Sequence, residues 1–477
     1  MQSRIPVRDS NMPVIQTENH GQFAVSKDLK WLLDWDDIGD RWRNEHDMTF
    51  GDDEVIAFPP ECRTPSAAKQ RIQHMRLDAE IRGRENAIQL LCEPDLWSIV
   101  DQELAVKVRE DSEGRQAAFA IMLTAFLEKP ANLMLLGSTA IGKTWLAKQV
   151  SAFLPSENVV ILGSSTQRAW FYCGEPVYKP HPVISGKQII DYYMVDWTNK
   201  VVVILDNVKP ETLKDLKPTM SHDQKEIDLQ TTEKTQAGHF RTRRVKTVGA
   251  PAFVNCSTWL QWDAELTSRH FYLTPKDDPA KYEAAAQYLD QEYTTGLAPT
   301  SRMVPIIQEA IRYLLSRKLQ IVIHPNVIQK LKEKFTWKSG RDVRDYERAA
   351  TVIQAIAWFH ALQRERNEQG QVIADERDLE IMKRFIQPLL KTSRFGTSGQ
   401  VLDYYERVLK PLSASDGDIR YDIIRGKYLE VYGRQLTRED LQIMNRALES
   451  LGLIELVVDP TDGRRRLVRL PTIQQQL

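Results

Sequence analysis

Long apolar stretches are missing from this sequence of 477 residues, and their absence excludes membrane-spanning proteins. The longest mostly apolar run, Ala117 to Leu127, is much shorter than the ~20 residues that a helix needs to cross a bilayer. The opening residues, MQSRIPVRDS, contain no apolar core of a signal peptide. We therefore expect a cytoplasmic protein without a membrane partner.

Cysteine is scarce and scattered. The four cysteines are separated by 30, 81 and 83 positions, and they are Cys62, Cys92, Cys173 and Cys256. This spacing fits neither a CxxC metal site nor a small disulfide framework. We therefore expect the protein to work in a reducing compartment.

An excess of charge of either sign is also missing. The 64 basic residues face 65 acidic ones, which gives a net charge of −1. Binding to nucleic acid would therefore depend on local basic patches. The sequence has two such patches, one with Arg241, Arg243, Arg244 and Lys246, and one with Arg464, Arg465, Arg466 and Arg469.

The rest of the composition, 42% hydrophobic and 27% charged residues, is typical of a globular protein. At ~150 residues per domain, the length predicts about three domains. Changes of pattern along the chain divide it further into four regions. These are a mainly helical N-terminal region (1–94), an α/β region (95–298), an all-helical region (299–395) and a C-terminal region (396–477).

The N-terminal region contains two predicted helices. Apolar residues at helical spacings, separated by aspartates, predict an amphipathic acidic helix with Trp31, Leu32, Trp35, Ile38 and Trp42 on one face. This face either packs on the rest of the region or docks a partner protein. The basic stretch Ala67 to Leu91 predicts a second helix, whose charges form either a solvated face or a DNA contact.

The middle of the chain alternates helical segments with short β-rich runs. Such runs are typical of a parallel sheet covered on both faces, and here they are Ala131 to Leu136, Asn158 to Leu162, Val201 to Leu205 and Ala252 to Asn255. After Pro299 the strand signals stop. Four helices are predicted there, over Val304 to Ser316, Pro325 to Lys334, Val343 to Arg366 and Ala374 to Lys391.

The C-terminal region has the order of a winged helix-turn-helix. Two predicted helices, Asp418 to Val431 and Arg438 to Leu451, precede two strands, Ile454 to Val458 and Arg464 to Leu470, that flank a turn. The basic second strand favours DNA binding. The second helix carries three acids beside its two arginines, so contact with a protein stays open as the alternative.

A phosphate-loop motif follows the first predicted strand of the α/β region. The residues Gly137, Ser138, Thr139, Ala140, Ile141, Gly142, Lys143 and Thr144 match GxxxxGK[ST] between a strand and a helix. In this motif backbone amides surround the phosphates, Lys143 reaches the β and γ phosphates, and Thr144 helps to hold Mg²⁺. We therefore predict a site for ATP and Mg²⁺.

Later strands supply further candidate residues for this site. Asp206 follows an apolar strand and is the expected second Mg²⁺ ligand. The next residue is Asn207, whose amide cannot take a proton, so the base is either Glu211 or Asp206, or else hydrolysis is slow. Asn255 is predicted to end another strand and to bind the attacking water or the γ-phosphate.

The order of these features resembles the AAA+ ATPases. There a phosphate loop, an acid-tipped strand and an Asn-tipped strand are followed by an arginine that reaches the γ-phosphate of a neighbouring subunit. The resemblance implies this arginine-finger role for Arg269, which stands fourteen residues after Asn255.

A predicted hairpin, Glu226 to Thr232 and Arg241 to Val248, narrows the resemblance. It is similar to the pre-sensor hairpin of the minichromosome-maintenance (MCM) helicases and of the superfamily III helicases, which grips DNA inside a ring. The resemblance implies DNA contacts for Lys234, Arg241, Arg243, Arg244 and Lys246, and the winged helix adds Arg464, Arg465 and Arg466. The all-helical region resembles the MCM lid, which implies a sensor role for Arg341 and favours MCM over superfamily III.

Two departures mark a divergent relative. The N-terminal region has no cysteine pairs for the MCM zinc ribbon, and Asn207 replaces the usual Glu. The resemblance implies a bacterial or archaeal protein of the mobile-element type. Its expected function is that of a ring-forming, hexameric DNA helicase or replication initiator. The alternative is a non-motor switch that assembles on DNA with ATP without unwinding it.

Overall fold

The computed structural model describes the following residues: 23–26, 32–36, 41–43, 49–50, 55–57, 65–163, 174–180, 186, 188–206, 217–221, 226–234, 240–258, 268–335, 337, 340–395, 397–412 and 418–470. The chain forms two compact units, Met1–Gln89 and Leu90–Leu477. Within the part of the chain that the structure describes, no helix has the length and apolarity needed to cross a membrane. The division into four regions stays a prediction.

The first unit contains an antiparallel sheet of order β4-β3-β2-β1-β5. Its strands are β1 (Phe23–Ser26), β2 (Leu32–Asp36), β3 (Arg41–Arg43), β4 (Thr49–Phe50) and β5 (Val55–Ala57). The predicted helix around Trp35 is therefore wrong, because this stretch forms strands. In the register of β2 and β3, Trp35 is the pairing partner of Trp42. The predicted basic helix is confirmed as α1 (Pro65–Cys92).

A parallel sheet forms the centre of the second unit, so the prediction of an α/β fold is confirmed. Its order is β14-β6-β13-β10-β7, with β6 (Asn132–Leu136), β7 (Val159–Leu162), β10 (Val201–Ile204), β13 (Ala252–Ser257) and β14 (His270–Leu273). The helices α2 (Leu96–Ala105), α3 (Ser112–Leu123) and α4 (Lys143–Ser151) and the 3₁₀ turns Thr124–Phe126 and Ser156–Asn158 lie between or before these strands. This arrangement is compatible with a phosphate-loop ATPase core.

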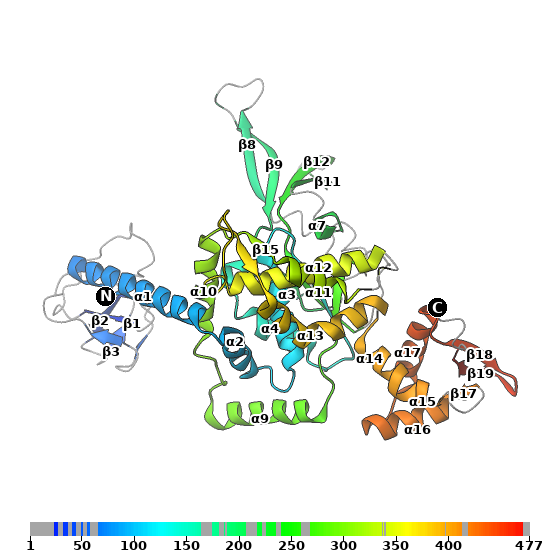
Figure 1. Cartoon of the computed structure of the whole chain (residues 1–477). Helices are drawn as coiled ribbons and strands as arrows, with labels where there is room; N and C mark the ends of the chain where they lie inside the picture. The colour runs from blue at the N-terminus through cyan, green and yellow to red at the C-terminus, as the bar shows by residue number, and fades with distance from the viewer. Residues whose placement is uncertain are drawn as a thin grey trace. The chain divides into compact units, whose positions relative to one another are not determined.

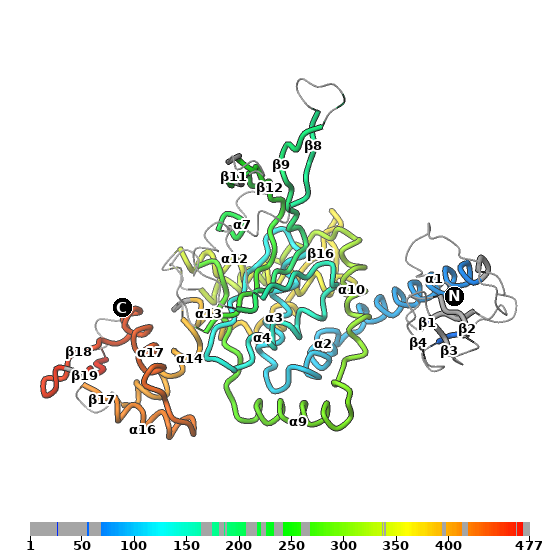
Figure 2. Tube along the Cα trace, turned by 180° about the vertical axis from the view of Figure 1, so that it is seen from behind, coloured from blue at the N-terminus to red at the C-terminus, as the bar shows by residue number. Residues whose placement is uncertain are grey.

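Two hairpins project from this core and form a second sheet (Figures 1 and 2). The predicted hairpin is confirmed as β11 (Glu226–Lys234) and β12 (Phe240–Val248), which pair along nine positions. The other hairpin, β8 (Glu175–Pro180) and β9 (Gln188–Asp196), was not predicted. Because β9 pairs in parallel with β12, the four strands form one sheet of order β11-β12-β9-β8. The short helix α7 (Lys217–Ser221) precedes β11.

Helices dominate after the parallel sheet, as predicted. They are α9 (Pro279–Thr295), α10 (Val304–Ser316), α11 (Pro325–Lys332), α12 (Gly340–Phe359) and α13 (Glu376–Phe395). The region is not all-helical, because β15 (Ile321–Ile323) pairs in parallel with β16 (Val372–Ala374). These three-residue strands are too short to stand out from their helical surroundings in the sequence.

The C-terminal segment, residues 397–470, has its own hydrophobic core, which includes Tyr404, Tyr428, Leu448 and Val468. It begins with α14 (Gly399–Tyr404), a π-helical turn (Tyr405–Leu409) and α15 (Lys410–Leu412). The predicted helices and ribbon follow as α16 (Tyr421–Tyr432), α17 (Arg438–Ser450), β18 (Glu455–Asp459) and β19 (Asp462–Arg469). The two-residue strand β17 (Ile419–Arg420) completes a sheet of order β17-β19-β18.

Candidate nucleotide-binding site

The phosphate-loop motif lies between the carboxyl end of β6 and the start of α4, as predicted. Its backbone turns sharply, with φ of 66° at Ala140 and 93° at Gly142. A residue with a Cβ atom is strained in the conformation of Gly142, which explains the glycine at this position. Because α4 begins at Lys143, unpaired amides and the positive end of the helix dipole face the loop. This geometry suits an anion such as a phosphate group.

Lys143 brings a buried cation to the loop. Its side chain is largely buried, and Nζ donates to the carbonyl oxygens of Gly137 at 2.8 Å and Ser138 at 2.6 Å. Burial lowers the pKa of Lys143. The neighbouring Cys256 thiol has a pKa raised by burial to about 12 and stays neutral, so it does not compete as an anion for the ammonium group. Lys143 is therefore placed to exchange two carbonyl contacts for phosphate oxygens.

The two predicted Mg²⁺ ligands lie near each other. Thr144 Oγ1 donates to the carbonyl of Leu205 at 3.4 Å, and Asp206 is the next residue after Leu205. A hydroxyl and a carboxylate are the oxygen donors that Mg²⁺ uses together with phosphates and water, so this donor set fits a Mg²⁺ nucleotide. The structure shows no cluster of three or more metal-binding side chains among its described residues. Asn207 and Glu211 lie outside those residues.

Asn255 does not end its strand, contrary to the prediction. Strand β13 continues to Ser257, which stands beside Leu136 at the start of the loop. Asn255 is buried within the sheet, and its Nδ2 lies 3.2 Å from Nε2 of His270 in β14. Ser257 therefore occupies the strand end that we predicted for Asn255, and its carbonyl accepts from the Gly137 amide at 3.3 Å.

Arg269 lies at the amino ends of the parallel strands, whereas the phosphate loop lies at their carboxyl ends. It immediately precedes β14, whose first residue, His270, stands beside Asn132, the first residue of β6. The loop follows the last residue of β6, Leu136. The length of a five-residue strand, ~16 Å, therefore separates the loop from the end of the sheet where Arg269 lies. Arg269 donates to the carbonyl of Lys217 in α7. The two groups therefore cannot bind the same phosphate within one chain.

Other basic residues gather near Arg269. A cavity of about 180 Å³ is lined there by Lys129, Arg269, Arg344 and Arg348, with Glu347 as the acidic member. Burial, helped by the charge of Arg341, lowers the pKa of Arg348 despite its ion pair with Asp345. The predicted sensor Arg341 lies on the first turn of α12, the helix that also carries Arg344 and Arg348.

Two residues that contact the phosphate loop, Lys281 and Gln400, carry no signal in the sequence. Lys281 of α9 donates to the carbonyl of Ile141 at 3.2 Å and forms a buried ion pair with Asp111 at 2.8 Å. Gln400 of α14 accepts from the Ser138 amide at 2.9 Å. The sequence gives no local signal for them, because they lie far from the loop along the chain and form no motif.

The predicted DNA-binding residues of the β11–β12 hairpin differ in exposure. Arg243 is buried, and its guanidinium lies 3.3 Å from the ring centroid of Tyr193. Arg244 is exposed and pairs with Asp228 at 2.8 Å, whereas Lys246 lies 3.8 Å from Glu226. The side chains of Lys234 and Arg241 lie outside the described part of the structure. Arg244 and Lys246 are therefore the accessible basic groups that the structure describes on this hairpin.

The predicted basic residues of the tail lie on β19. Arg465 is exposed and pairs with Asp462 at 3.1 Å, and Arg466 is also exposed. The side chain of Arg464 lies outside the described residues. Arg469 pairs with Asp418 at 2.7 Å, which connects β19 to the residue before β17.

Comparison of the chain with protein-family models and with curated proteins gives no match, so the geometry of the site is the basis for its proposed function.

Proposed function

We propose that the chain is an ATP-dependent, ring-forming DNA helicase or replication initiator of the MCM-like AAA+ type. The observation that carries the proposal is the separation of Lys143 and Arg269, which lie at opposite ends of the strands of one sheet. If both act on one γ-phosphate, they must come from neighbouring subunits. Repeating such a head-to-tail interface closes a ring when the rotation allows, and the resemblance favours a hexamer.

The residues at the loop divide the chemistry between them. The loop amides and Lys143 hold the phosphates, and Thr144 and Asp206 hold Mg²⁺, which would neutralise charge on the phosphate oxygens. Arg269 of a neighbouring subunit stabilises the charge that develops on the γ-phosphate. Arg341, on the first turn of α12, contacts the same phosphates in the proposed ring.

The second sheet supports DNA as the substrate. The face that carries Arg244 and Lys246 also carries Met194, which is 39% exposed and pairs with Lys246, and the partly exposed Tyr192, whose ring centroid lies 5.1 Å from Lys246 Nζ. Basic groups beside exposed aromatic rings suit single-stranded nucleic acid, because bases stack on the rings while cations contact phosphates. Under the proposal, both hairpins contact the strand inside the ring.

The helical part and the C-terminal segment complete the proposed assembly. The α10–α13 part serves as the lid, and the C-terminal segment serves as a winged helix with β18–β19 as the wing. In the DNA-binding form of the proposal, α17 enters the major groove and Arg464, Arg465 and Arg466 contact the flanking backbone. The first turn of α17 carries Glu439 and Asp440, which oppose phosphate, so protein contact remains the alternative for this segment.

A non-motor switch is the second candidate function. Asn207 follows Asp206 in place of a proton-accepting Glu, and the buried Asn255 amide contacts His270. Both features favour slow hydrolysis. In this reading ATP binding assembles the protein on DNA, and hydrolysis resets it.

A Lys143→Ala variant tests the nucleotide site that both candidates share. Removing the ammonium leaves the phosphates without their main positive charge, so we expect this variant neither to bind a fluorescent ATP analogue nor to hydrolyse ATP. Circular dichroism controls for folding. ATP hydrolysis at the parent rate in this variant would contradict the proposed site.

A strand-displacement assay on forked DNA then separates the two candidates. The helicase unwinds the fork with ATP, and Lys143→Ala protein does not. The switch binds the same fork with ATP and unwinds nothing.

A further inference from the structure

Ser138 of the phosphate loop is held by two side chains, Lys143 of the same motif and the distant Gln400 of α14. Its carbonyl accepts from Lys143 Nζ at 2.6 Å, and its amide donates to Gln400 Oε1 at 2.9 Å. Gln400 Nε2 lies 3.2 Å from Ser138 Oγ. Lys143 must leave this carbonyl to reach a phosphate, so nucleotide binding changes the contacts of the residue that Gln400 holds.

Gln400 also connects the loop to a partly exposed ion pair. Its Nε2 donates to Asp277 Oδ2 at 2.8 Å, and both Asp277 oxygens accept from the guanidinium of Arg434. Burial would raise the pKa of Asp277, but the Tyr282 hydrogen bond, the Arg434 charge and the Gln400 hydrogen bond outweigh it and lower that pKa. Asp277 therefore stays ionised and keeps both partners at neutral pH.

Gln400 and Arg434 both belong to the C-terminal segment. Gln400 is in the first turn of α14, whose Tyr404 shares a hydrophobic core with Tyr428 of α16. Arg434 comes two residues after the end of α16 and also donates to the Tyr428 hydroxyl at 3.3 Å. A movement of this segment would therefore move both contacts.

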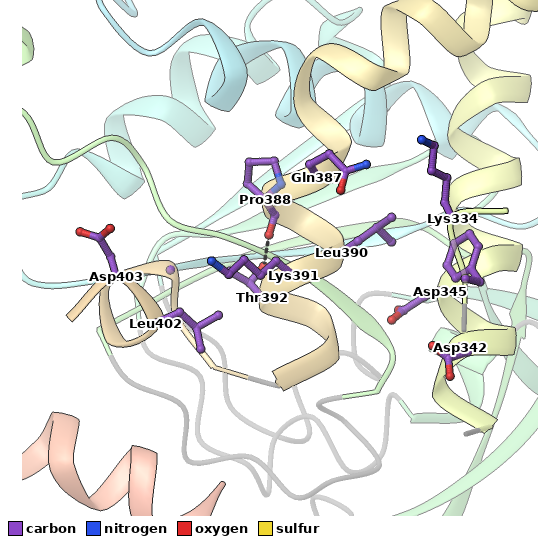
Figure 3. Close-up of a pocket in the computed structure, with 12 residues that line it drawn as sticks. Lys334, Asp342, Asp345, Gln387, Pro388, Leu390, Lys391, Thr392, Leu402 and Asp403 are labelled. Carbon is purple, nitrogen blue, oxygen red and sulfur yellow. Dashed lines mark hydrogen bonds between the residues drawn. The ribbon is translucent and has the colours of Figure 1, made fainter. Parts of the chain in front are cut away.

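The surroundings of α14 leave space for such a movement. A cavity of about 590 Å³ is lined by residues of α12, α13 and α14, among them Asp345, Thr392 and Asp403 (Figure 3). Gly399, the first residue of α14, lines the same cavity, and its amide donates to Thr274 Oγ1 at 2.8 Å. The first turn of α14 therefore borders this cavity at Gly399 and contacts the phosphate loop through Gln400.

We infer that Gln400, with Asp277 and Arg434, couples the nucleotide state of the phosphate loop to the C-terminal segment. Gln400 is a positioning residue in this inference, which rests on the proposed nucleotide binding. By holding Ser138, it stabilises the loop form in which Lys143 is bonded to backbone carbonyls. Coupling between sites is reciprocal, so a ligand that displaces the C-terminal segment also changes nucleotide affinity.

Hydrogen exchange of the full-length protein with and without ATPγS tests this coupling. We expect ATPγS to slow exchange in peptides that cover 133–146 and also to change exchange in peptides that cover 397–404 and 421–436. In Gln400→Ala protein, the loop should still respond, whereas the response of 421–436 should fall at least about fivefold. A loop response in the parent protein without a C-terminal response would overturn the inference and leave the proposed function intact. Absence of both responses would contradict nucleotide binding itself, and the inference with it.

A double-mutant cycle provides a second test. Gln400→Ala and Arg434→Ala should each tighten binding of a fluorescent ATP analogue by about fivefold, because each weakens the hold on Ser138. The double variant should bind no more tightly than the better single variant, since both act through Asp277. Lys427→Ala is the matched control, because it removes the same charge from α16 and its partner is Glu430 of the same helix. Additive effects, or affinities within about twofold of the parent, would overturn the inference.

Discussion

His360 is a residue whose protonation the fold opposes. It is buried after α12, where its ring stacks on Trp97 at 6.1 Å and its Nδ1 lies 2.8 Å from the carbonyl of Ile356. The carbonyl can only accept, so Nδ1 carries the hydrogen. Burial, with a smaller effect of the Arg364 charge, lowers the pKa of His360 to about 4. The folded protein therefore keeps a neutral imidazole at a pH where an exposed histidine is protonated.

This depressed pKa predicts a specific decrease of stability in acid. An unfolded histidine has a pKa near 6.5, so the unfolded state gains a proton first as the pH falls. Below about pH 6.5, protonation of the unfolded state lowers the free energy of unfolding, until near pH 4 the folded histidine is protonated as well. Between pH 7 and pH 5, this effect of His360 lowers the free energy of unfolding by about 2 kcal/mol. Urea unfolding of the parent and of His360→Phe at both pH values measures it, and an equal acid sensitivity of the two proteins would contradict the prediction.

Some residues of the candidate site can be predicted from the sequence immediately around them, whereas others cannot. Lys143 and Thr144 could be predicted because the loop motif is contiguous and its backbone conformation demands Gly142. The role of Asn255 could not, because two further residues pair in β13 and move the strand end to Ser257. Lys281 and Gln400 reach the loop from other elements, and only tertiary packing brings them there.

At the scale of elements, the β11–β12 hairpin leads to a prediction about how DNA binding depends on salt concentration. Arg244 and Lys246 face solvent with weak, exposed ion pairs, so phosphates can replace their acidic partners. We expect Arg244→Ala with Lys246→Ala to weaken binding of single-stranded DNA without sequence preference. The log-log salt slope should fall by ~0.7 for each phosphate that the variant no longer neutralises.

Fluorescence anisotropy at several salt concentrations measures this slope. Lys330→Ala with Lys383→Ala is the control, since it removes two exposed charges from α11 and α13. An unchanged slope in the hairpin variant would instead indicate a solvated face. Arg243→Ala is expected to reduce stability rather than DNA binding, because Arg243 is buried against Tyr193.

Elements with long-range partners were the hardest to predict. The apolar spacing around Trp35 fits a helix, yet β2 pairs with strands on both sides, and this pairing outweighs the helical period. Strands β8 and β9 combine prolines and tyrosines without a regular alternation, and β8 shifts register at Val177. The strands of the parallel sheet were easier, because continuous apolar runs such as Val201–Ile204 are buried on both faces.

At the scale of the whole molecule, the parallel sheet separates two sets of charged groups. The phosphate loop lies at the carboxyl end of β6, and Arg269 lies at the amino end of β14, with Arg344 beside it. An isolated chain therefore has an incomplete site under the proposal, whereas a head-to-tail ring completes one site at each interface. ATPase activity is then a property of the assembly and should depend on protein concentration.

Mixing two inactive variants tests this shared site. Arg269→Ala should still bind nucleotide, because its own loop is intact, but its hydrolysis rate should fall ~10³- to 10⁵-fold. Lys143→Ala should bind no nucleotide but still offer Arg269. In an equal mixture, about one quarter of the interfaces in a head-to-tail ring join an intact loop to an intact arginine. We therefore expect ATPase activity to return to a measurable fraction of the parent rate, in proportion to those interfaces. A mixture as inactive as its components, with assembly confirmed by light scattering, would place Arg269 outside the site.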